Sequence, residues 1–559
     1  MDCYLMKIPE NMKNAVKYTV AFLSGVSLLA FAGCNPLDQA PTNKFTDDTF
    51  WSSADRAQSV VNMAYNQMYS HTKFLDDEAL SDNIFEQRGG PDTRTIRTGT
   101  ANASTGLFES EWKWIYQGIK TCNVFMDKVD LVPDLDEGSK AGMIAQIKFI
   151  RAYLYFRAVN FYGAVPFFLS DITLDQSKTS VRTPKADIIP QLVSEVESVI
   201  PVLPSRDELS ASDNGKITKA AAMVLLARIY MYNPDLYPDW ASEVADICDD
   251  LIHNQAEYGT YSLFTTADEH CSAYENLFMS AYEYNSEVIL DYSAMETIKQ
   301  WTTFNNLAPM AVGSALIQRA PTRELVDDYL MFNGKKIDES GSGYNESDPY
   351  SNRDPRLLYT IGCHGKIWKD VNNNGAYTEY TLDVLSNESK DKFSVGSNST
   401  PTGFFVRKYY DMEHGPEFKQ WNNIIMMRYA DVLLMYAEAK HALGEFDQNV
   451  WDETIRPIRE RAGFSEDVCA YPSSLGSDQM QDLIRRERRC ELALEGLRYY
   501  DILRWNIGSD VLNCNVRSSS ETGSVILDAR VFSDRDKLWS IPQSQLELVP
   551  TLLPNNPGY

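Results

Sequence analysis

Apolar side chains recur at helical spacing over much of the chain. Over residues 109–129, one stripe is formed by Trp112, Ile115, Ile119, Cys122 and Met126. The three- and four-residue steps between them predict one apolar helix face. Similar spacing predicts further helices at residues 53–70, 140–162, 184–202, 215–230, 240–253, 427–443 and 451–462. Because long and short helical segments alternate, we expect a mostly α-helical scaffold of helix-turn-helix units, similar to tetratricopeptide repeats.

The most distinctive pattern lies at residues 484–505, where the spacing predicts one continuous helix. Its apolar stripe consists of Leu483, Cys490, Leu494 and Leu497. Glu491 and Glu495 are four residues apart and would therefore lie on one face. Arg488 and Arg498 flank them, which predicts an arginine–glutamate lattice in a partly buried helix. The alternative is a glycosidase acid/base pair, but flanking arginines keep both carboxylates ionised instead of raising one pKa.

Residues 255–425 follow a different pattern. Helical spacing fades, Tyr, Trp, Asn, Gly and Ser become frequent, and short β-rich runs such as residues 288–290 appear. We expect a loop-rich, partly β insert at 255–425. An N-terminal helical part at 45–254 precedes it, and a C-terminal helical part at 426–559 completes the same domain.

Composition and motifs exclude several function classes. The 559-residue chain carries a formal net charge of −26, whereas nucleic-acid binding requires a basic surface. The sequence contains no G-x-S-x-G, H-E-x-x-H or P-loop motif, which are the signatures of common hydrolases and nucleotide-binding proteins. Its six histidines show no metal-binding spacing. We therefore expect a binding protein without catalytic activity.

The N-terminus has the features of a targeting segment. Lys13 and Lys17 precede an apolar run at residues 20–32, which is too short to span a bilayer. The run ends at Phe31-Ala32-Gly33-Cys34, which resembles a bacterial lipobox. The pattern predicts a signal peptide at 1–33, lipidation of Cys34 and a polar tether at 34–44, so that the protein is anchored to the membrane by lipid.

Several stretches resemble one protein family. They are E-R-R-C-E-L-A-L-E-G-L-R-Y-Y-D-I-L-R-W at 487–505, F-I-R-A-Y-L-Y-F at 149–156, G-K-I-T-K-A-A-A at 215–222 and N-N-P-G-Y at 555–559. These stretches resemble the SusD/RagB family of surface lipoproteins from Bacteroidetes, and the resemblance extends over essentially the whole chain. It implies capture of an oligosaccharide or polysaccharide at the outer-membrane surface, for delivery to a SusC-like TonB-dependent transporter. Capture of peptides, as in RagB-like relatives, is the alternative, and a glycoside hydrolase is less favoured.

Two loops have the composition that glycan binding requires. Sugars present an apolar face and hydroxyl rims, which aromatic and polar side chains match respectively. The candidate ligand-binding residues are Phe74, Asp82 and Arg88 in residues 74–100, and Tyr284, Tyr292, Trp301, Phe304 and Asn305 in residues 282–306. Trp301 is the strongest candidate, because Gln, Thr and Asn surround it. The alternative for each ring is packing in the core.

One further segment resembles half of a calcium-binding loop. Asp370, Asn372 and Asn374 occupy the first, third and fifth positions of an EF-hand pattern, followed by Gly375. The twelfth position is Thr381 instead of the usual bidentate Glu. Structural calcium at this loop is therefore one interpretation and a plain Asn-Gly turn is the other. No other cofactor is expected.

Overall fold

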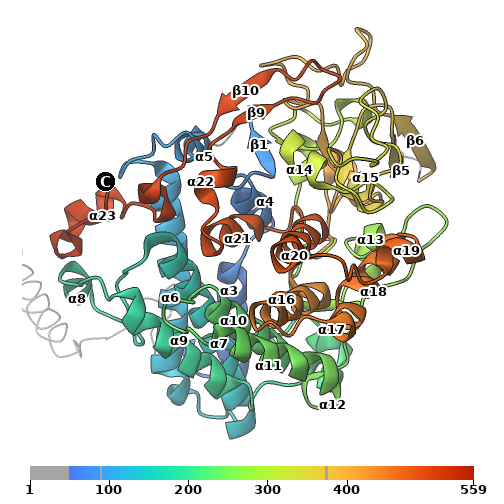
Figure 1. Cartoon of the computed structure of the whole chain (residues 1–559). Coiled ribbons are helices and arrows are strands. Elements are labelled where there is room, and N and C mark those ends of the chain that lie inside the picture. The colour runs from blue at the N-terminus through green and yellow to red at the C-terminus, as the bar shows by residue number, and fades with distance from the viewer. Residues whose placement is uncertain (1–49, 89–90, 372–374) are drawn as a thin grey trace, which may run out of the picture.

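The structure of the protein is a computed structural model that describes residues 50–559, except 89–90 and 372–374. The predicted signal peptide, the tether and Cys34 lie outside the described residues. Seven long helices follow one another as neighbours in space, with α3 against α6 and α7, and α11 against α16. Their bounds are α3 (Ala54–Met68), α6 (Gly106–Lys128), α7 (Glu137–Tyr162), α9 (Lys185–Val199), α10 (Lys219–Met231), α11 (Trp240–His253) and α16 (Tyr429–Ala442). The prediction of a mostly helical, tetratricopeptide-like scaffold is confirmed (Figure 1).

The ends of these helices follow from local sequence. The carboxylate of Asp136 accepts a hydrogen bond of 2.9 Å from the backbone N–H of Ser139 and so caps α7, as expected of a helix N-cap. Gly163 ends α7 with a φ of +67°, a conformation that glycine adopts at low cost. The Thr218 side chain caps α10 in the same way.

Short strands occur mainly in residues 255–425, at the upper right of Figure 1. Five antiparallel pairs are present among the described residues: β1 (Ile84–Glu86) with β3 (Arg319–Pro321), β2 (Val288–Tyr292) with β8 (Ile424–Arg428), β4 (Ile361–Gly362) with β7 (Phe405–Val406), β5 (Ile367–Val371) with β6 (Tyr377–Thr381), and β9 (Asn515–Arg517) with β10 (Ile526–Ala529). Short helices α13 (Ala273–Asn276), α14 (Arg323–Asp328) and α15 (Arg356–Thr360) lie between them. The residues before α16, predicted as its first turn, belong to β8.

The predicted continuous helix at residues 484–505 is wrong. Helix α20 (Ser477–Glu491) ends at Glu491, and α21 (Arg498–Arg504) begins seven residues later. Between them Leu494 and Gly496 have φ values of +64° and +81°, which an α-helix does not contain. A Cβ on Gly496 would lie 2.9 Å from the Cα of Phe74, so the glycine also permits close approach of α4 (Lys73–Glu78). The apolar spacing continues across this break at Leu494 and Leu497, so the sequence pattern does not indicate it.

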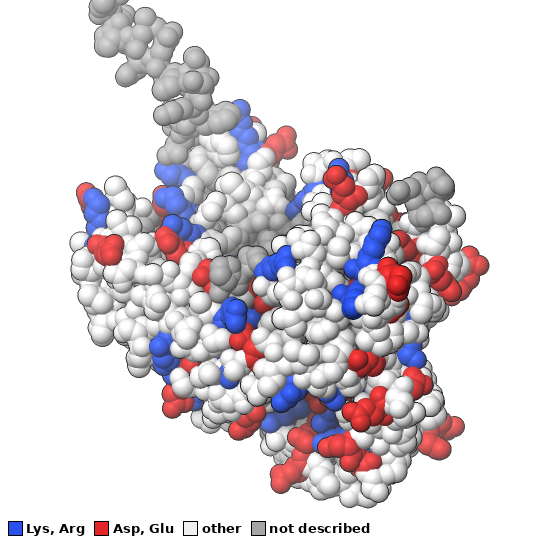
Figure 2. Space-filling model, turned by 90° about the horizontal axis from the view of Figure 1, so that it is seen from above, with Lys and Arg blue, Asp and Glu red and all other residues white. Residues whose placement is uncertain are grey.

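The surface carries charges of both signs. Seen from above, acidic and basic side chains are scattered over a largely uncharged surface, without one basic patch on this face (Figure 2). Among residues 50–559 that the structure describes, no helix combines the length and apolarity needed to cross a membrane.

Candidate functional site

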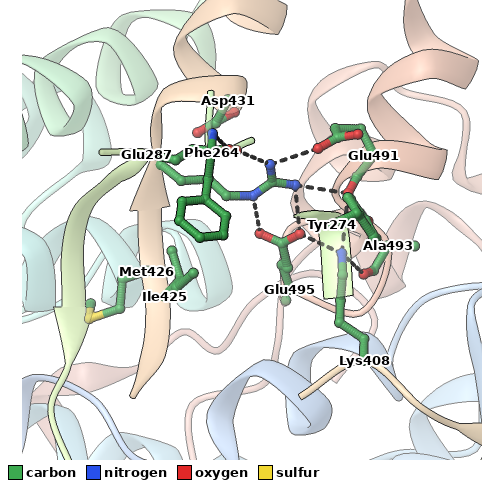
Figure 3. A network of polar contacts seen from close by, with 12 residues as sticks. Phe264, Tyr274, Glu287, Lys408, Ile425, Met426, Asp431, Glu491, Ala493 and Glu495 are labelled. Carbon is green, nitrogen blue, oxygen red and sulfur yellow. Dashed lines mark hydrogen bonds and ion pairs between the residues drawn. The ribbon is translucent and has the colours of Figure 1, made fainter. Parts of the chain in front are cut away.

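A network of buried ion pairs lies where α20 meets the β2–β8 ribbon (Figure 3). The Arg428 guanidinium donates from Nη1 to Glu287 and Glu491 at 2.7 Å each, and from Nε to Glu495 at 2.8 Å. All four side chains are buried. Bidentate and charge-assisted contacts of this kind fix the geometry of every partner. Arg428 therefore joins Glu491 and Glu495 to the ribbon.

Lys408 completes the network from below in Figure 3. Its Nζ donates to the Glu495 carboxylate at 2.6 Å and to the Ala493 carbonyl at 2.8 Å. Burial lowers the pKa of Lys408 to about 8, although Glu495 opposes the shift. Burial alone would raise the pKa of Glu495, but Arg428 and Lys408 lower it instead. The Glu495 carboxylate is therefore ionised and held by two cations.

Glu491 is similarly enclosed. Arg356 donates to its carboxylate at 2.9 Å, and Arg461 and Arg428 are also within ion-pair distance. Burial opposes ionisation, yet these three arginines hold the pKa of Glu491 well below its usual range. A glycosidase requires one carboxyl with a raised pKa and access to substrate. Both carboxylates are buried and ionised, so the glycosidase hypothesis is wrong.

The predicted arginine–glutamate lattice exists, but its predicted pairs are wrong. Arg488 binds Asp431 and Asp501 rather than Glu491, with its Nε 2.9 Å from Asp501. Arg498 binds both oxygens of Asp82 at 2.8 and 3.0 Å. The break after α20 separates Glu495 from the helix that carries Arg498, whereas Arg488 and Glu491 share α20 but are each bound by partners from other segments.

The β2–β8 ribbon extends from this network to Tyr292. At one end Val288 pairs with Arg428, and at the other Tyr292 pairs with Ile424. Glu287 directly precedes β2 and Asn423 directly precedes β8. One end of the ribbon is therefore fixed by buried ion pairs, and at the other end Tyr292, Ile424 and Asn423 are also buried.

Three rings meet at the outer end of the ribbon, namely His71, Tyr292 and Trp301, which we call the ring cluster. The His71 ring lies 4.8 Å from that of Tyr292 and is stacked with Trp301 at 6.0 Å between centroids. The ammonium of Lys299 lies 3.8 Å from the centre of the Tyr292 ring, a cation–π contact. Burial lowers the pKa of Lys299 to about 8, with Asp291 opposing it. These side chains come from the α3–α4 turn, β2 and the segment that follows β2.

His71 and Lys299 have unused hydrogen-bonding capacity. Both side chains are half-buried. Among the described residues, His71 Nε2 has no hydrogen-bond partner although it is buried. Burial, followed by the charge of Lys299, lowers the pKa of His71 to about 4. The imidazole is therefore neutral near pH 7, and its buried Nε2 keeps hydrogen-bonding capacity that no described group uses.

A polar rim borders the ring cluster. Asn423 donates from Nδ2 to Asp291 at 2.7 Å and from its backbone to Glu283 at 3.0 Å. Burial, and then the charge of Asp291, raise the pKa of Glu283 to about 8. Burial also raises the pKa of Asp291 to about 6, although the hydrogen bond from Asn423 opposes it. Near pH 7 Glu283 is therefore mainly a neutral carboxylic acid, which can both donate and accept hydrogen bonds.

Four of the predicted ligand-binding rings are buried. Phe74 and Phe304 have no exposed surface, while Trp301 and Tyr292 expose 5% and 8%. Phe74 packs 4.9 Å from Tyr409. The prediction that these rings stand exposed on loops is wrong, because Phe74 lies in α4, Tyr292 lies in β2 and Phe304 lies in a short 3-10 helix, where their side chains pack into the core. Trp301 and Tyr292 still form the floor of the ring cluster.

Trp301 is held by hydrogen bonds from both its backbone and its indole ring. Its backbone N–H donates to the Gln420 carbonyl at 3.0 Å, and its indole N–H donates to the Asn422 carbonyl at 2.9 Å. Removing a buried tryptophan side chain costs about 3–5 kcal/mol. Trp301 is therefore a structural support of the site, and its truncation would test folding rather than binding.

The remaining predicted residues are dispersed. Asp82 is buried and paired with Arg498, so it is unavailable to a ligand. Arg88 is half-buried and donates to Asn398 at 2.6 Å. Asn305 is half-buried, and its carbonyl accepts from Ala315. Only Tyr284 joins the polar rim: it is half-buried, and its hydroxyl lies 3.3 Å from that of Ser293.

The predicted calcium loop takes a different form. Asp370 lies in β5, where its carboxylate accepts a hydrogen bond of 2.8 Å from Tyr410 and lies 3.3 Å from His414 Nε2. Thr381, the twelfth position, pairs with Ile367 at the far end of the β5–β6 hairpin. Asp370 is thus engaged by Tyr410 and His414 inside the insert. The candidates Asn372 and Asn374 lie outside the described residues.

Two protein-family models match separate parts of the chain. A family model described as the SusD family matches residues 255–559. The chain belongs to the SusD family. A second model, described as starch-binding and associating with the outer membrane, matches residues 37–231. Members of the SusD family are binding proteins without enzymatic activity, which agrees with the buried state of Glu491 and Glu495.

Relatives of the SusD family cover nearly the whole chain. SusD-like protein P25 of Formosa agariphila is 24% identical over 90% of this chain and 91% of its own. A SusD-like carbohydrate-binding protein from Bacteroides fragilis has a TM-score of 0.79 at 26% identity, covering 90% of this chain and all of its own. A laminarin-binding SusD-like protein has a TM-score of 0.65 at 22% identity, over 91% of this chain and all of its own. The last likeness establishes the fold alone.

Proposed function

We propose that this protein captures glycans at the outer surface of the outer membrane and delivers them to a SusC-like TonB-dependent transporter. Family membership supports this proposal, as does the similarity to a carbohydrate-binding protein of the same fold. The observation that carries it is the ring cluster, where apolar ring surface, an unpaired imidazole nitrogen and a neutral carboxyl lie together. Such a combination matches the apolar face and hydroxyl groups of a sugar.

The arrangement indicates how a glycan would bind. Because Tyr292 and Trp301 expose little surface, the half-buried His71, Tyr284 and Lys299 would make most direct contacts. Lys299 covers the Tyr292 ring, so a sugar that packs against this ring displaces the ammonium. The released ammonium can then donate hydrogen bonds to sugar hydroxyls.

A glycan array followed by calorimetry tests both the function and the site. The array, run beside a peptide library, identifies a ligand whose affinity is then measured for the wild type, His71→Ala and Lys299→Met. Losing a hydrogen bond to a charged group costs about 1.5–3 kcal/mol, so Lys299→Met should weaken binding about ten- to hundredfold. Lys178→Met on α8 (Leu174–Lys178) is the matched control, since this lysine is exposed and, among the described residues, forms an ion pair with Asp175 alone.

The possible outcomes separate the two parts of the proposal. If a glycan binds but both site variants keep wild-type affinity, the function stands and the ring cluster is not its site. If only peptides bind, glycan capture is contradicted. Delivery is tested separately by purifying the tagged protein from membranes and asking whether a TonB-dependent transporter accompanies it. Cys34→Ala should release the protein from the membrane fraction if Cys34 carries the lipid anchor.

A further inference from the structure

Arg485 differs from the other arginines of α20. Arg486 and Arg489 pair with Asp328, and Arg488 pairs with Asp431 and Asp501. Among the described residues, by contrast, no carboxylate lies within ion-pair distance of Arg485, and its buried Nε has no hydrogen-bond partner. A partly buried guanidinium without an anion is unfavourable. Burial accordingly lowers the pKa of Arg485, only partly opposed by more distant carboxylates such as Glu438.

Arg485 lines a cleft of about 170 Å³ on the helical scaffold. Trp240 at the start of α11 and Trp505 at the end of α21 contribute half-buried indoles, while Gln481 and His441 add polar groups. Most of the lining residues come from α11, α16, α20 and α21 or their ends, which lie one below another from the middle of Figure 1, at α21 and α20, down to α16 and α11. The cleft is thus built by the scaffold and not by the loops that form the ring cluster.

The two tryptophans are held differently. The Trp505 indole N–H donates to Glu438 at 2.7 Å, and the Arg485 guanidinium lies 4.7 Å from the centre of the Trp505 ring. The Trp240 ring stacks on no other aromatic ring of the described chain, and no hydrogen bond of its indole N–H is found there. Trp505 is therefore a fixed wall that orients Arg485, while Trp240 offers an apolar face and a free donor.

We propose that this cleft binds a carboxylate-bearing sugar residue of a glycan, with Arg485 receiving the carboxylate and Trp240 packing against the ring. A guanidinium pairs with a carboxylate through two parallel hydrogen bonds, and an aromatic face matches the apolar face of a sugar. Drug-sized ligands occupy about 300–1,000 Å³, so this smaller cleft accepts a single ring. The inference concerns a second site and stands whether or not the ring cluster binds glycans.

The chemistry of the carboxylate provides the test. Methyl β-D-glucuronide and methyl β-D-glucoside share one ring and differ only in carrying a carboxylate or a hydroxymethyl group. Ligand-observed NMR titration of the whole protein should show glucuronide binding at least tenfold tighter than glucoside binding. Arg485→Gln should abolish this preference, and Trp240→Ala should weaken binding of both ligands. Arg456→Gln is the control, because Arg456 lies on another helix, α18 (Ile455–Ala462), and pairs with Asp452.

A further variant keeps the test decisive if Arg485→Gln fails to fold. Gln481 is exposed and precedes Arg485 by one helical turn, so Gln481→Glu places a carboxylate beside the guanidinium. This variant should lose glucuronide binding and keep the melting temperature of the wild type. Three results would overturn the proposal: no glucuronide signal at millimolar protein and ligand, unchanged affinity in folded Gln481→Glu, or loss of binding in His71→Ala, which would assign the signal to the ring cluster.

Discussion

Replacing Glu491 by glutamine tests whether the buried ion network stabilises the fold. The substitution keeps the size of the side chain and removes one negative charge from the centre of three arginines, Arg356, Arg428 and Arg461. The side chain is completely buried, so water cannot replace the lost charge. The perturbation is therefore electrostatic, with little change in packing.

The expected loss can be bounded from the structure. Breaking one buried ion pair costs about 3–5 kcal/mol. The sum of three such losses is not expected, because each arginine keeps another carboxylate: Arg428 and Arg461 retain Glu287, and Arg356 retains Asp354. We expect Glu491→Gln to lower the free energy of unfolding by about 3–5 kcal/mol.

Urea unfolding at pH 7 measures this change, with Glu137→Gln as the control. Glu137 is exposed and its nearest cation is Lys140 at 3.9 Å, so the control should stay within about 0.5 kcal/mol of the wild type. Because the folded-state pKa of Glu491 is depressed, its contribution is present above its unfolded pKa of about 4.5 and decreases as the pH falls below it. A loss under 1 kcal/mol at pH 7 would refute the reasoning.

Two further predictions concern the break after α20 and the polar rim. An unfavourable backbone conformation costs about 1–3 kcal/mol. Gly496→Ala should destabilise the protein by more than this, because the added Cβ would meet the Phe74 backbone. Gly523 has a φ of +91° with open space around it, so Gly523→Ala should show the backbone cost alone in the same urea assay. Because the pKa of Glu283 is raised to about 8, the folded protein binds more protons than the unfolded chain between pH 4.5 and 8. The stability of the wild type therefore falls as the pH rises through this range. Glu283→Gln should accordingly raise the urea midpoint at pH 8.5 and leave it nearly unchanged at pH 4. An equal effect of Glu283→Gln at both pH values would contradict the second prediction, and equal losses in the two glycine variants would contradict the first.

The helical scaffold could be predicted because its information is local. Amphipathic spacing and capping residues such as Asp136 and Gly163 lie within the helices that they define. The break after α20 could not be predicted in this way, since Leu494 continues the apolar stripe while adopting a positive φ. Only contact with α4, more than 400 residues away in the chain, explains why Gly496 is needed there. The Arg428 partners are equally non-local, because Glu287 precedes Arg428 by 141 residues.

The candidate site was predicted only as a region. Polar neighbours in sequence favoured exposure of Trp301, but they do not determine toward which side a ring points, and the indole is buried. His71 and Lys299 were missed because a single histidine or lysine carries no motif. Their role becomes visible only when the α3–α4 turn and the segment after β2 are placed together.

The β2–β8 ribbon gives the buried network a consequence for binding. Val288 lies opposite Arg428 at one end of the ribbon and Tyr292 lies opposite Ile424 at the other, with register irregularities on both sides of Leu290. Such irregularities are typical of β-bulges, which bend a strand locally. Arg428 cannot shift without breaking contacts to carboxylates from two separate segments, before β2 and after α20. The network therefore fixes the Glu287–Arg428 end of the ribbon. A scaffold that is ordered before a ligand arrives loses less conformational entropy on binding, which is a role that buried charges can serve in a protein that performs no catalysis.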